Sequence, residues 1–442
     1  MMEKFRKTVI CLLGVLFATA VLVQESFGGG FALYEWGARG QTLGGAMTAR
    51  ADDPSAVAYN PAGITQLEGL NILGGLSLVS VKADLQTTNM YDGNTSKVHN
   101  DNTFQPLPHI YFTTPINDRL YFGAGAFTRF GLGVEWPEDW AGRYATTDAE
   151  LITFSVNNNL AYQVTEKFSV AVGLEIMYVD LHLENYVDAN KILAAGGAPV
   201  NINDPNTSDM DVKSELNGDD TAFGYNIGFH YIYSDALSIG AHYRRRVDVK
   251  ASGDLRFDEP SHTVRDMGLA GLFQNTGISG EVTLPDMLFT GVMFRPLPDL
   301  SIELGATWTH WSLYDELTID YDSTLLGQEG TVSEKNWDST WRYSLGVEWN
   351  ATDRLALRAS YVFDETPVDY QYSDYLVPDS DRHMFGLGLG YNISDIHIDI
   401  GYLYIDFDSH STPNRQIEEG IPQTEYKEAD AHIIGLSVSK AF

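Results

Sequence analysis

The connections between the predicted strands of this chain alternate between two lengths. Short connections rich in turn residues lie at 117–118, 165–167, 234–235, 296–299, 352–353 and 394–395. Long polar stretches separate them, at 87–105, 132–150, 188–220, 258–277, 323–335, 366–380 and 409–427. Six short turns and seven long loops make fourteen strands, with both ends of the sheet on the short-turn side. This layout is typical of an outer-membrane β-barrel, whose closed sheet leaves no edge for lipid to satisfy.

The strands themselves have a period of two, as the run Ile396–Tyr404 shows by alternating an apolar face with a largely polar one. A soluble sandwich also alternates, but its loops are not sorted by length. In the last strand, one face carries Ile434, Leu436, Val438 and the terminal Phe442. A carboxy-terminal aromatic resembles the signal that outer-membrane assembly machinery reads; a soluble strand that happens to end in Phe is the alternative. The fold class predicted is an all-β, fourteen-stranded antiparallel transmembrane barrel.

The amino terminus predicts export. Residues 1–28 place Lys4, Arg6 and Lys7 before an uncharged run and end in small residues, which is the pattern of a signal peptide. Cys11, the only cysteine, lies within it, so the exported chain has no thiol for a disulfide or a metal. The net charge of −32 argues against nucleic acid as a partner, because phosphate binding needs a positive surface. Outer-membrane lipid and lipopolysaccharide are the expected surroundings, with divalent cations bridging the charges.

A helical segment stands ahead of the strands. Asp53 before Pro54 and Asn60 before Pro61 each place a side-chain acceptor at a helix N-cap with proline at the first helical position. Two short helical turns are therefore expected within 51–67. We predict that residues 29–68 form a plug, the hatch, and that residues 69–442 form the barrel around it.

Several motifs carry a family resemblance. The stretch from Gly29 to Gly69 resembles the amino-terminal hatch of the FadL/TodX family of outer-membrane transporters for fatty acids and hydrophobic compounds. Its NPA motif is matched by Asn60, Pro61 and Ala62, which we assign to the gating hatch. The likeness continues in GLGVEWPEDWAGRY at 131–144, FDETPVDY at 363–370 and VPDSDRH at 377–383.

The resemblance implies a monomeric barrel blocked by the hatch, with both chain ends in the periplasm. A hydrophobic molecule is captured in an outer-loop groove, passes to a pocket against the hatch and leaves sideways where the third strand is kinked. The chemistry is binding and diffusion, without an enzyme reaction, cofactor or metal. Long-chain fatty acids are the first expected substrate, and monoaromatic hydrocarbons are the alternative. A general diffusion porin is less compatible with an insert of about forty residues ahead of the barrel.

The third strand, 120–133, contains the expected kink at Gly123, Gly125 and Gly131, because glycine weakens a strand and marks bends or close backbone approaches. A barrel corner would use the same glycines. The resemblance places Thr128 and Arg129 in the pocket, but strict alternation cannot turn both inward without a bulge.

Five further residues are candidates for the ligand path through the resemblance. Arg382 would hold a carboxylate head group with its bidentate fork, or would pair with Asp379 or Asp381 in a structural network. Trp136 and Trp140 would line the outer groove or anchor the barrel at the membrane interface. Phe31 and Leu33 would insert into the pocket or pack the plug.

One arginine cluster and one alternative function remain to be weighed. The run 244–246 consists of three arginines, of which one or two are expected to face the lumen and balance its carboxylates. A membrane-embedded hydrolase would need a nucleophile, a base and an orienting group together, and no motif in the chain supplies them.

Overall fold

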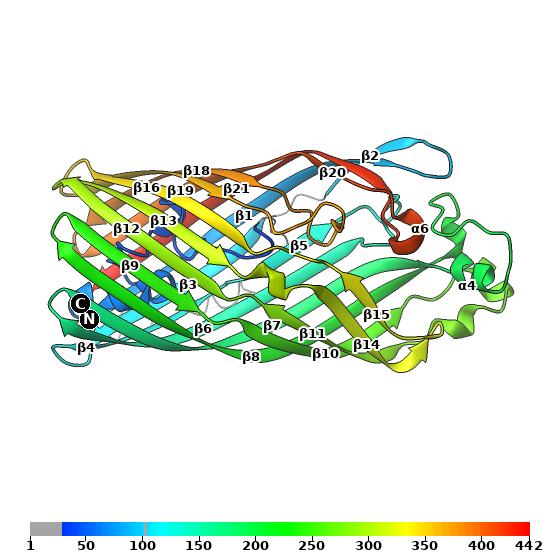
Figure 1. Cartoon of the computed structure of the whole chain (residues 1–442), viewed down its shortest axis with the longest axis horizontal. Coiled ribbons are helices and arrows are strands. Elements are labelled where there is room, and N and C mark those ends of the chain that lie inside the picture. The colour runs from blue at the N-terminus through cyan, green and yellow to red at the C-terminus, as the bar shows by residue number, and fades with distance from the viewer. Residues whose placement is uncertain (1–28, 101–103) are drawn as a thin grey trace.

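The computed structural model describes residues 29–100 and 104–442, so the predicted signal peptide 1–28 lies outside the described residues. Twenty-one strand segments form one antiparallel sheet that closes when β1 (Asn71–Thr88) pairs with β21 (Gln423–Ala441). Seven barrel strands are interrupted and each contributes two segments, which leaves fourteen strands around the ring. The prediction of a fourteen-stranded antiparallel barrel is confirmed (Figure 1).

The remaining uninterrupted strands are β6 (Asp148–Thr165), β7 (Phe168–Asp188), β8 (Asp211–Ser234), β17 (Leu355–Asp364) and β18 (Arg382–Ile393). The interrupted strands are β2 (Thr95–His99) with β3 (Gln105–Pro115), β4 (Leu120–Phe127) with β5 (Gly131–Glu135), β9 (Leu237–Arg244) with β10 (Val247–Phe257), β11 (Thr276–Leu284) with β12 (Met287–Leu297), β13 (Leu300–Thr309) with β14 (Glu316–Leu325), β15 (Gln328–Glu334) with β16 (Thr340–Asn350), and β19 (Ile396–Phe407) with β20 (His410–Thr412). Short helices are α2 (Ala38–Thr42), α3 (Ala56–Tyr59), η1 (Pro61–Gln66), α4 (Asn190–Ala195), η2 (Ser208–Met210), α5 (His262–Asp266), η3 (Ala270–Leu272), η4 (Trp311–Leu313) and α6 (Gln416–Glu419).

The six predicted short turns connect strands where expected, but two of the predicted long loops contain more strand than expected. β7 and β8 stay paired out to Asp188 and Asp211, so the loop predicted at 188–220 is shorter by about a third. The stretch 323–335 is a tight hairpin that turns at Leu326 and Gly327, both with positive φ. In both stretches the strands carry charged and polar residues on the outward face, so polar sequence there does not mark a loop; the inward face of 211–220 is still buried, at Val212, Ser214 and Leu216.

The apolar faces of the strands point outward. Large exposed hydrophobic side chains lie on this surface, for example Leu174, Phe223, Leu304, Leu387, Ile400, Leu436 and Phe442. Inward positions on the same strands carry buried polar groups such as Glu175, Asn226, Asp399 and Ser437. This arrangement is the reverse of a soluble core and suits a barrel surrounded by lipid. Among the described residues, no helix has the length and apolar character needed to cross a membrane.

The hatch, residues 29–68, lies within the barrel towards the end that carries the short turns (Figure 1). Its helix α2 contacts β17, β18, β19, β21 and β1, while α3 and η1 contact β4, β6, β7 and β8 on the other side of the ring. Asn60 caps η1 as predicted, since its side chain accepts from the Ala62 N–H at 3.2 Å. The prediction for Asp53 is wrong: α3 begins at Ala56, and Asp53 instead accepts from the Ser55 N–H.

Candidate functional site

An apolar cavity lies in the outer half of the lumen, against the first residues of the hatch. Its walls come from β5 to β8, β10, β11, β14 and the loop between β17 and β18. The lining residues are Phe31, Leu132, Leu151, Val179, Leu181, Leu183, Leu216, Gly218, Val249, Ala251, Ile278, Gly280, Val282, Tyr314, Leu317, Thr318, Ile319, Leu376 and Val377. None of them is charged. The cavity measures about 70 Å³ with Phe31 in place, which is room for a few water molecules only.

Phe31 sits in a box of aromatic rings at the floor of this cavity. The centroid of its ring lies 4.7 Å from that of Trp311, 5.6 Å from Tyr314, 5.7 Å from Trp337 and 6.1 Å from Phe130. The contact with Trp337 is tilted and the other three are edge-on, and edge-on contacts at these separations are favourable for aromatic pairs. A hydrophobic molecule larger than a few atoms fits the cavity only if this ring withdraws.

The third barrel strand is interrupted beside the same segment. β4 ends at Phe127 and pairs with β3, whereas β5 starts at Gly131 and pairs with β6 alone. The hatch occupies the edge that β5 leaves open: Ala32 forms a β-bridge with Phe130. The Leu33 N–H donates to the Arg129 carbonyl at 2.8 Å, and the Gly131 N–H donates to the Phe31 carbonyl at 2.9 Å. One short segment therefore fills the cavity floor and completes the wall.

The glycines of this strand serve close packing of the hatch. A Cβ at Gly123 would lie 2.8 Å from the Val57 side chain, and one at Gly125 would lie 2.5 Å from Tyr111 and 3.0 Å from Val57. At Gly131 the added atom would lie 2.9 Å from Leu33, which packs there and does not line the cavity. Gly123 and Gly125 thus lie within β4 and admit α3, while Gly131 borders the interruption.

Thr128 and Arg129 lie in the interruption and do not line the cavity. The Thr128 carbonyl accepts from the Trp36 indole N–H at 2.8 Å. Arg129 is fully buried and donates to Glu175 Oε2 at 2.7 Å. Arg244, the first residue of the arginine run, faces the lumen as predicted and approaches the same oxygen at 3.5 Å.

Arg382 begins β18 and is buried beside the first residues of the hatch. It pairs with Asp364 at 2.8 Å, and its charge also acts on Asp379, one of the two partners expected for a structural network. The neighbouring Asp379 accepts from the Gly30 N–H at 2.9 Å and from the Thr366 hydroxyl at 2.7 Å. Burial raises the pKa of Asp379 to about 6, and the positive charge of Arg382 opposes that rise.

Trp136 and Trp140 lie inside the outer loops and are buried. Their rings stack with centroids 5.1 Å apart, and Trp140 contacts the Tyr375 ring edge-on at 4.5 Å. The Trp136 indole N–H also donates to the Tyr375 carbonyl at 3.3 Å. The pair joins the loop after β5 to the loop before β18 and presents little surface to lipid, which leaves the interface-anchor alternative without support.

The NPA motif anchors the hatch to the barrel wall. The Asn60 amide donates to the Thr48 carbonyl at 2.8 Å within the hatch and to the Phe229 carbonyl of β8 at 2.9 Å. Pro61 and Ala62 open η1 and are buried. The motif thus fixes the body of the hatch, at a distance along the chain from the segment that contacts the cavity.

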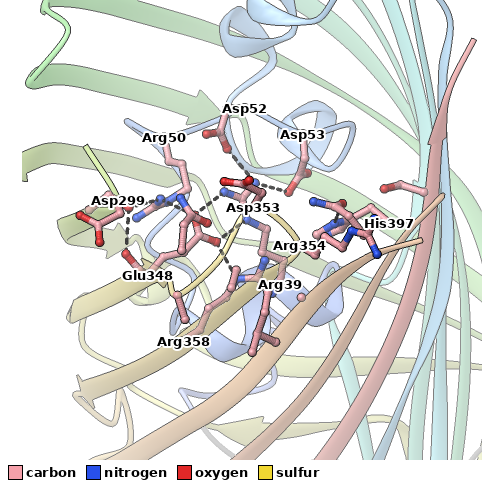
Figure 2. Close-up of a pocket in the computed structure, with 18 of the residues that line it drawn as sticks. Arg39, Arg50, Asp52, Asp53, Asp299, Glu348, Asp353, Arg354, Arg358 and His397 are labelled. Carbon is pink, nitrogen blue, oxygen red and sulfur yellow. Dashed lines mark hydrogen bonds and ion pairs between the residues drawn. The ribbon is translucent and has the colours of Figure 1, made fainter. Parts of the chain in front are cut away.

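A second cavity, of about 1420 Å³, opens beneath the hatch at the short-turn end and is lined by charged side chains (Figure 2). Glu348 of β16 binds two arginines of the hatch there, Arg39 at 2.9 Å and Arg50 at 3.0 Å, and Arg358 of β17 at 2.6 Å. Arg39 also pairs with Asp52 at 2.7 Å. Sequence reasoning missed this cluster because its members are far apart along the chain and match no motif.

The barrel with short helices ahead of it agrees with comparisons to known proteins. The family described as outer membrane protein transport protein (OMPP1/FadL/TodX) matches residues 19–442. The chain belongs to this family. It is therefore an outer-membrane transporter of hydrophobic compounds and not an enzyme, as predicted.

Individual members of the OMPP1/FadL/TodX family differ in what they carry. A long-chain fatty acid transport protein of Escherichia coli O6:H1 is 26% identical over 417 residues, which cover 90% of this chain and 92% of that protein. A FadL homologue of Pseudomonas aeruginosa has the same fold with a TM-score of 0.82 at 20% identity, covering 93% of this chain and 100% of the homologue. The toluene transporter TbuX of Ralstonia pickettii aligns with a TM-score of 0.66 at 16% identity, covering 93% and 99%.

Proposed function

We propose that this protein takes up long-chain fatty acids by binding them in the apolar cavity and releasing them sideways through the interrupted third strand. The observation that carries the proposal is the double contact of residues 31–33. Phe31 fills the cavity floor, and the backbone on either side of Ala32 is hydrogen-bonded to the open edge at 129–131. A ligand that displaces the ring must also strain these bonds, so binding and opening of the wall are coupled.

The cavity suits an alkyl chain. Its walls are aliphatic, and a buried methylene group is stabilised by about 0.8 kcal/mol relative to water. An eight-carbon portion would gain about 6 kcal/mol, of the order needed to displace one buried phenylalanine ring. Small aromatic hydrocarbons remain the second candidate substrate, and the absence of charge among the lining residues favours them.

The outer loops supply the entry. Trp136, Trp140 and Tyr375 tie two loops together above the cavity, and Leu376 and Val377 of the second loop belong to the cavity wall. A molecule captured among these loops would reach the cavity without crossing water. We propose the two loops, which the buried rings of Trp136, Trp140 and Tyr375 hold together, as the capture site.

Uptake of a radiolabelled fatty acid by cells that lack their own transporter tests this function. The variant Ala251→Glu places a carboxylate in the cavity, whereas Ser252→Glu places one on the outer face of the same strand. We expect uptake to be lost in the first variant and kept in the second, with both barrels present in the outer membrane. Equal uptake by the two variants would show that the cavity is not on the route.

A general porin would conduct ions steadily across a membrane, whereas a barrel blocked by its hatch would not. The hatch contacts strands around the ring, so the purified barrel should conduct almost no ions across a planar bilayer. Steady conductance by the intact protein would favour the porin.

A further inference from the structure

A buried charge cluster beside the strand interruption contains two arginines and one carboxylate. Arg129 and Arg244 both contact Oε2 of Glu175, at 2.7 and 3.5 Å, and all three side chains are fully buried. Within residues 29–100 and 104–442, no second carboxylate forms an ion pair with either arginine. The cluster therefore has a formal charge of +1 in a site shielded from water.

Other buried cations of the lumen meet at least as many carboxylates. The pairs and groups are Lys335 with Asp374, Arg342 and Arg382 with Asp364 and Asp379 nearby, and Arg39, Arg50 and Arg358 with Glu348, Asp52, Asp53 and Asp399. An uncompensated buried charge costs several kcal/mol unless a counter-charge or hydrogen bonds offset it. The excess of positive charge at Arg129 and Arg244 thus sets this cluster apart from the other ion pairs described in the lumen.

The cluster also holds unused hydrogen-bonding capacity. The Nε atoms of both arginines are buried without a hydrogen-bond partner. Arg244 Nη2 donates to the Ala58 carbonyl at 2.9 Å, and Arg129 Nη2 reaches only the Met287 sulfur, at 3.7 Å. A guanidinium with a free Nε and a weakly bonded Nη presents the fork that binds a carboxylate through two parallel bonds.

The position of the cluster relates it to the apolar cavity. Arg129 lies within the strand interruption, next to Phe130, which forms the β-bridge with Ala32 of the hatch. Glu175 is four residues from the cavity-lining Val179 on β7, a separation of about 13 Å along the strand. An amphiphile with its chain in the cavity and its head group at the cluster would span this interval.

We propose that Arg129 and Arg244, balanced by Glu175, bind the carboxylate of an acidic amphiphile at the strand interruption. This proposal rests on the proposed function and gives that site a preference for acids over neutral hydrocarbons. A carboxylate entering the cluster brings its charge to zero and uses the open donors. Glu175 sets the strength of the site, because a carboxylate that bound both arginines too tightly would not leave.

Equilibrium binding of hexadecanoic acid and of its methyl ester to the purified barrel tests this proposal. In Arg244→Gln, the cluster becomes neutral, and we expect acid binding to weaken by about tenfold while ester binding is unchanged. In Glu175→Gln, the charge rises to +2, and we expect acid binding to strengthen by about tenfold with the ester again unchanged. The double variant returns the charge to +1 and should restore the acid-to-ester ratio towards the wild-type value.

Opposite shifts in the two single variants distinguish charge recognition from loss of structure, which would weaken both probes in both variants. The proposal is overturned if the acid-to-ester ratio stays constant or moves in the same direction in Arg244→Gln and Glu175→Gln. If the wild-type protein binds both probes but the acid-to-ester ratio does not shift in opposite directions in the two variants, only this proposal is contradicted. Wild-type protein that binds neither probe would contradict the proposed function.

Discussion

Phe31→Ala tests whether the aromatic box holds the leading segment of the hatch, residues 29–37, in its closed position. The ring is 4% exposed and contacts four other aromatic rings. Removing a buried phenylalanine side chain costs about 3 to 5 kcal/mol in a packed interior. The body of the hatch keeps its own contacts, including Asn60 to Phe229 and Arg39 to Glu348, so this loss falls on the leading segment. A loss of about 3 kcal/mol raises the detached population of that segment by about a hundredfold.

Amide hydrogen exchange of the purified barrel measures this population. Protection of the Leu33 and Gly131 amides depends on the two hydrogen bonds that flank the β-bridge. We expect their exchange to accelerate by about a hundredfold in Phe31→Ala, while amides of η1 exchange at the wild-type rate. Phe104→Ala, which removes a ring that is 65% exposed, is the matched control and should change neither. Unchanged protection of Leu33 and Gly131 in Phe31→Ala would refute the reasoning.

Three further predictions concern the hatch. Glu348→Gln leaves three arginines without their shared carboxylate, so anchoring of the hatch should weaken by about 3 to 5 kcal/mol. Ion conductance of the variant in planar bilayers should then rise, and conductance as low as that of the wild type would contradict this. Asn60→Ala removes the cap and the bond to Phe229, and faster proteolysis of the hatch is expected from a loss of about 1 to 3 kcal/mol. Asp379 accepts from the Gly30 N–H of the leading segment at 2.9 Å. Asp379→Ala should therefore speed amide exchange within residues 29–37 through a loss of about 1 to 3 kcal/mol, and unchanged exchange would contradict this anchoring role.

The barrel could be predicted because its constraints are local. A period of two and turn residues at regular intervals are visible in the sequence, and closure follows from the requirement that no strand edge meets lipid. The hatch was recognisable for the same reason, since Asn60 and Pro61 mark a helix start whatever surrounds them. The strand at 211–220 was misassigned as loop because its outward residues are charged or polar, although Leu216 and Gly218 on its inward face line the apolar cavity.

The candidate site was less predictable because it depends on contacts between distant residues. Phe31 lines the cavity as one of the two alternatives had it, but the β-bridge of the adjacent Ala32 to Phe130 depends on which strand edge the kink leaves open. Arg382 was singled out from a motif, although its partner Asp364 lies on a neighbouring strand. Glu175 carries no motif at all. The period of β7 could have placed it on the inward face, where an acidic residue requires a basic partner.

A disulfide across the β-bridge tests the gate most directly. Ala32 and Phe130 are paired residues, and the Cα atoms of antiparallel partners lie about 4.5 to 5.5 Å apart, within the range that a disulfide spans. Cys11 is the only native cysteine and lies outside the hatch and barrel, so Ala32→Cys with Phe130→Cys forms a single crosslink. We expect fatty acid uptake to stop when this pair is oxidised and to return on reduction, with both single-cysteine variants active throughout. Full uptake through the crosslinked barrel would contradict the claim that residues 31–33 must leave the wall for substrate to pass.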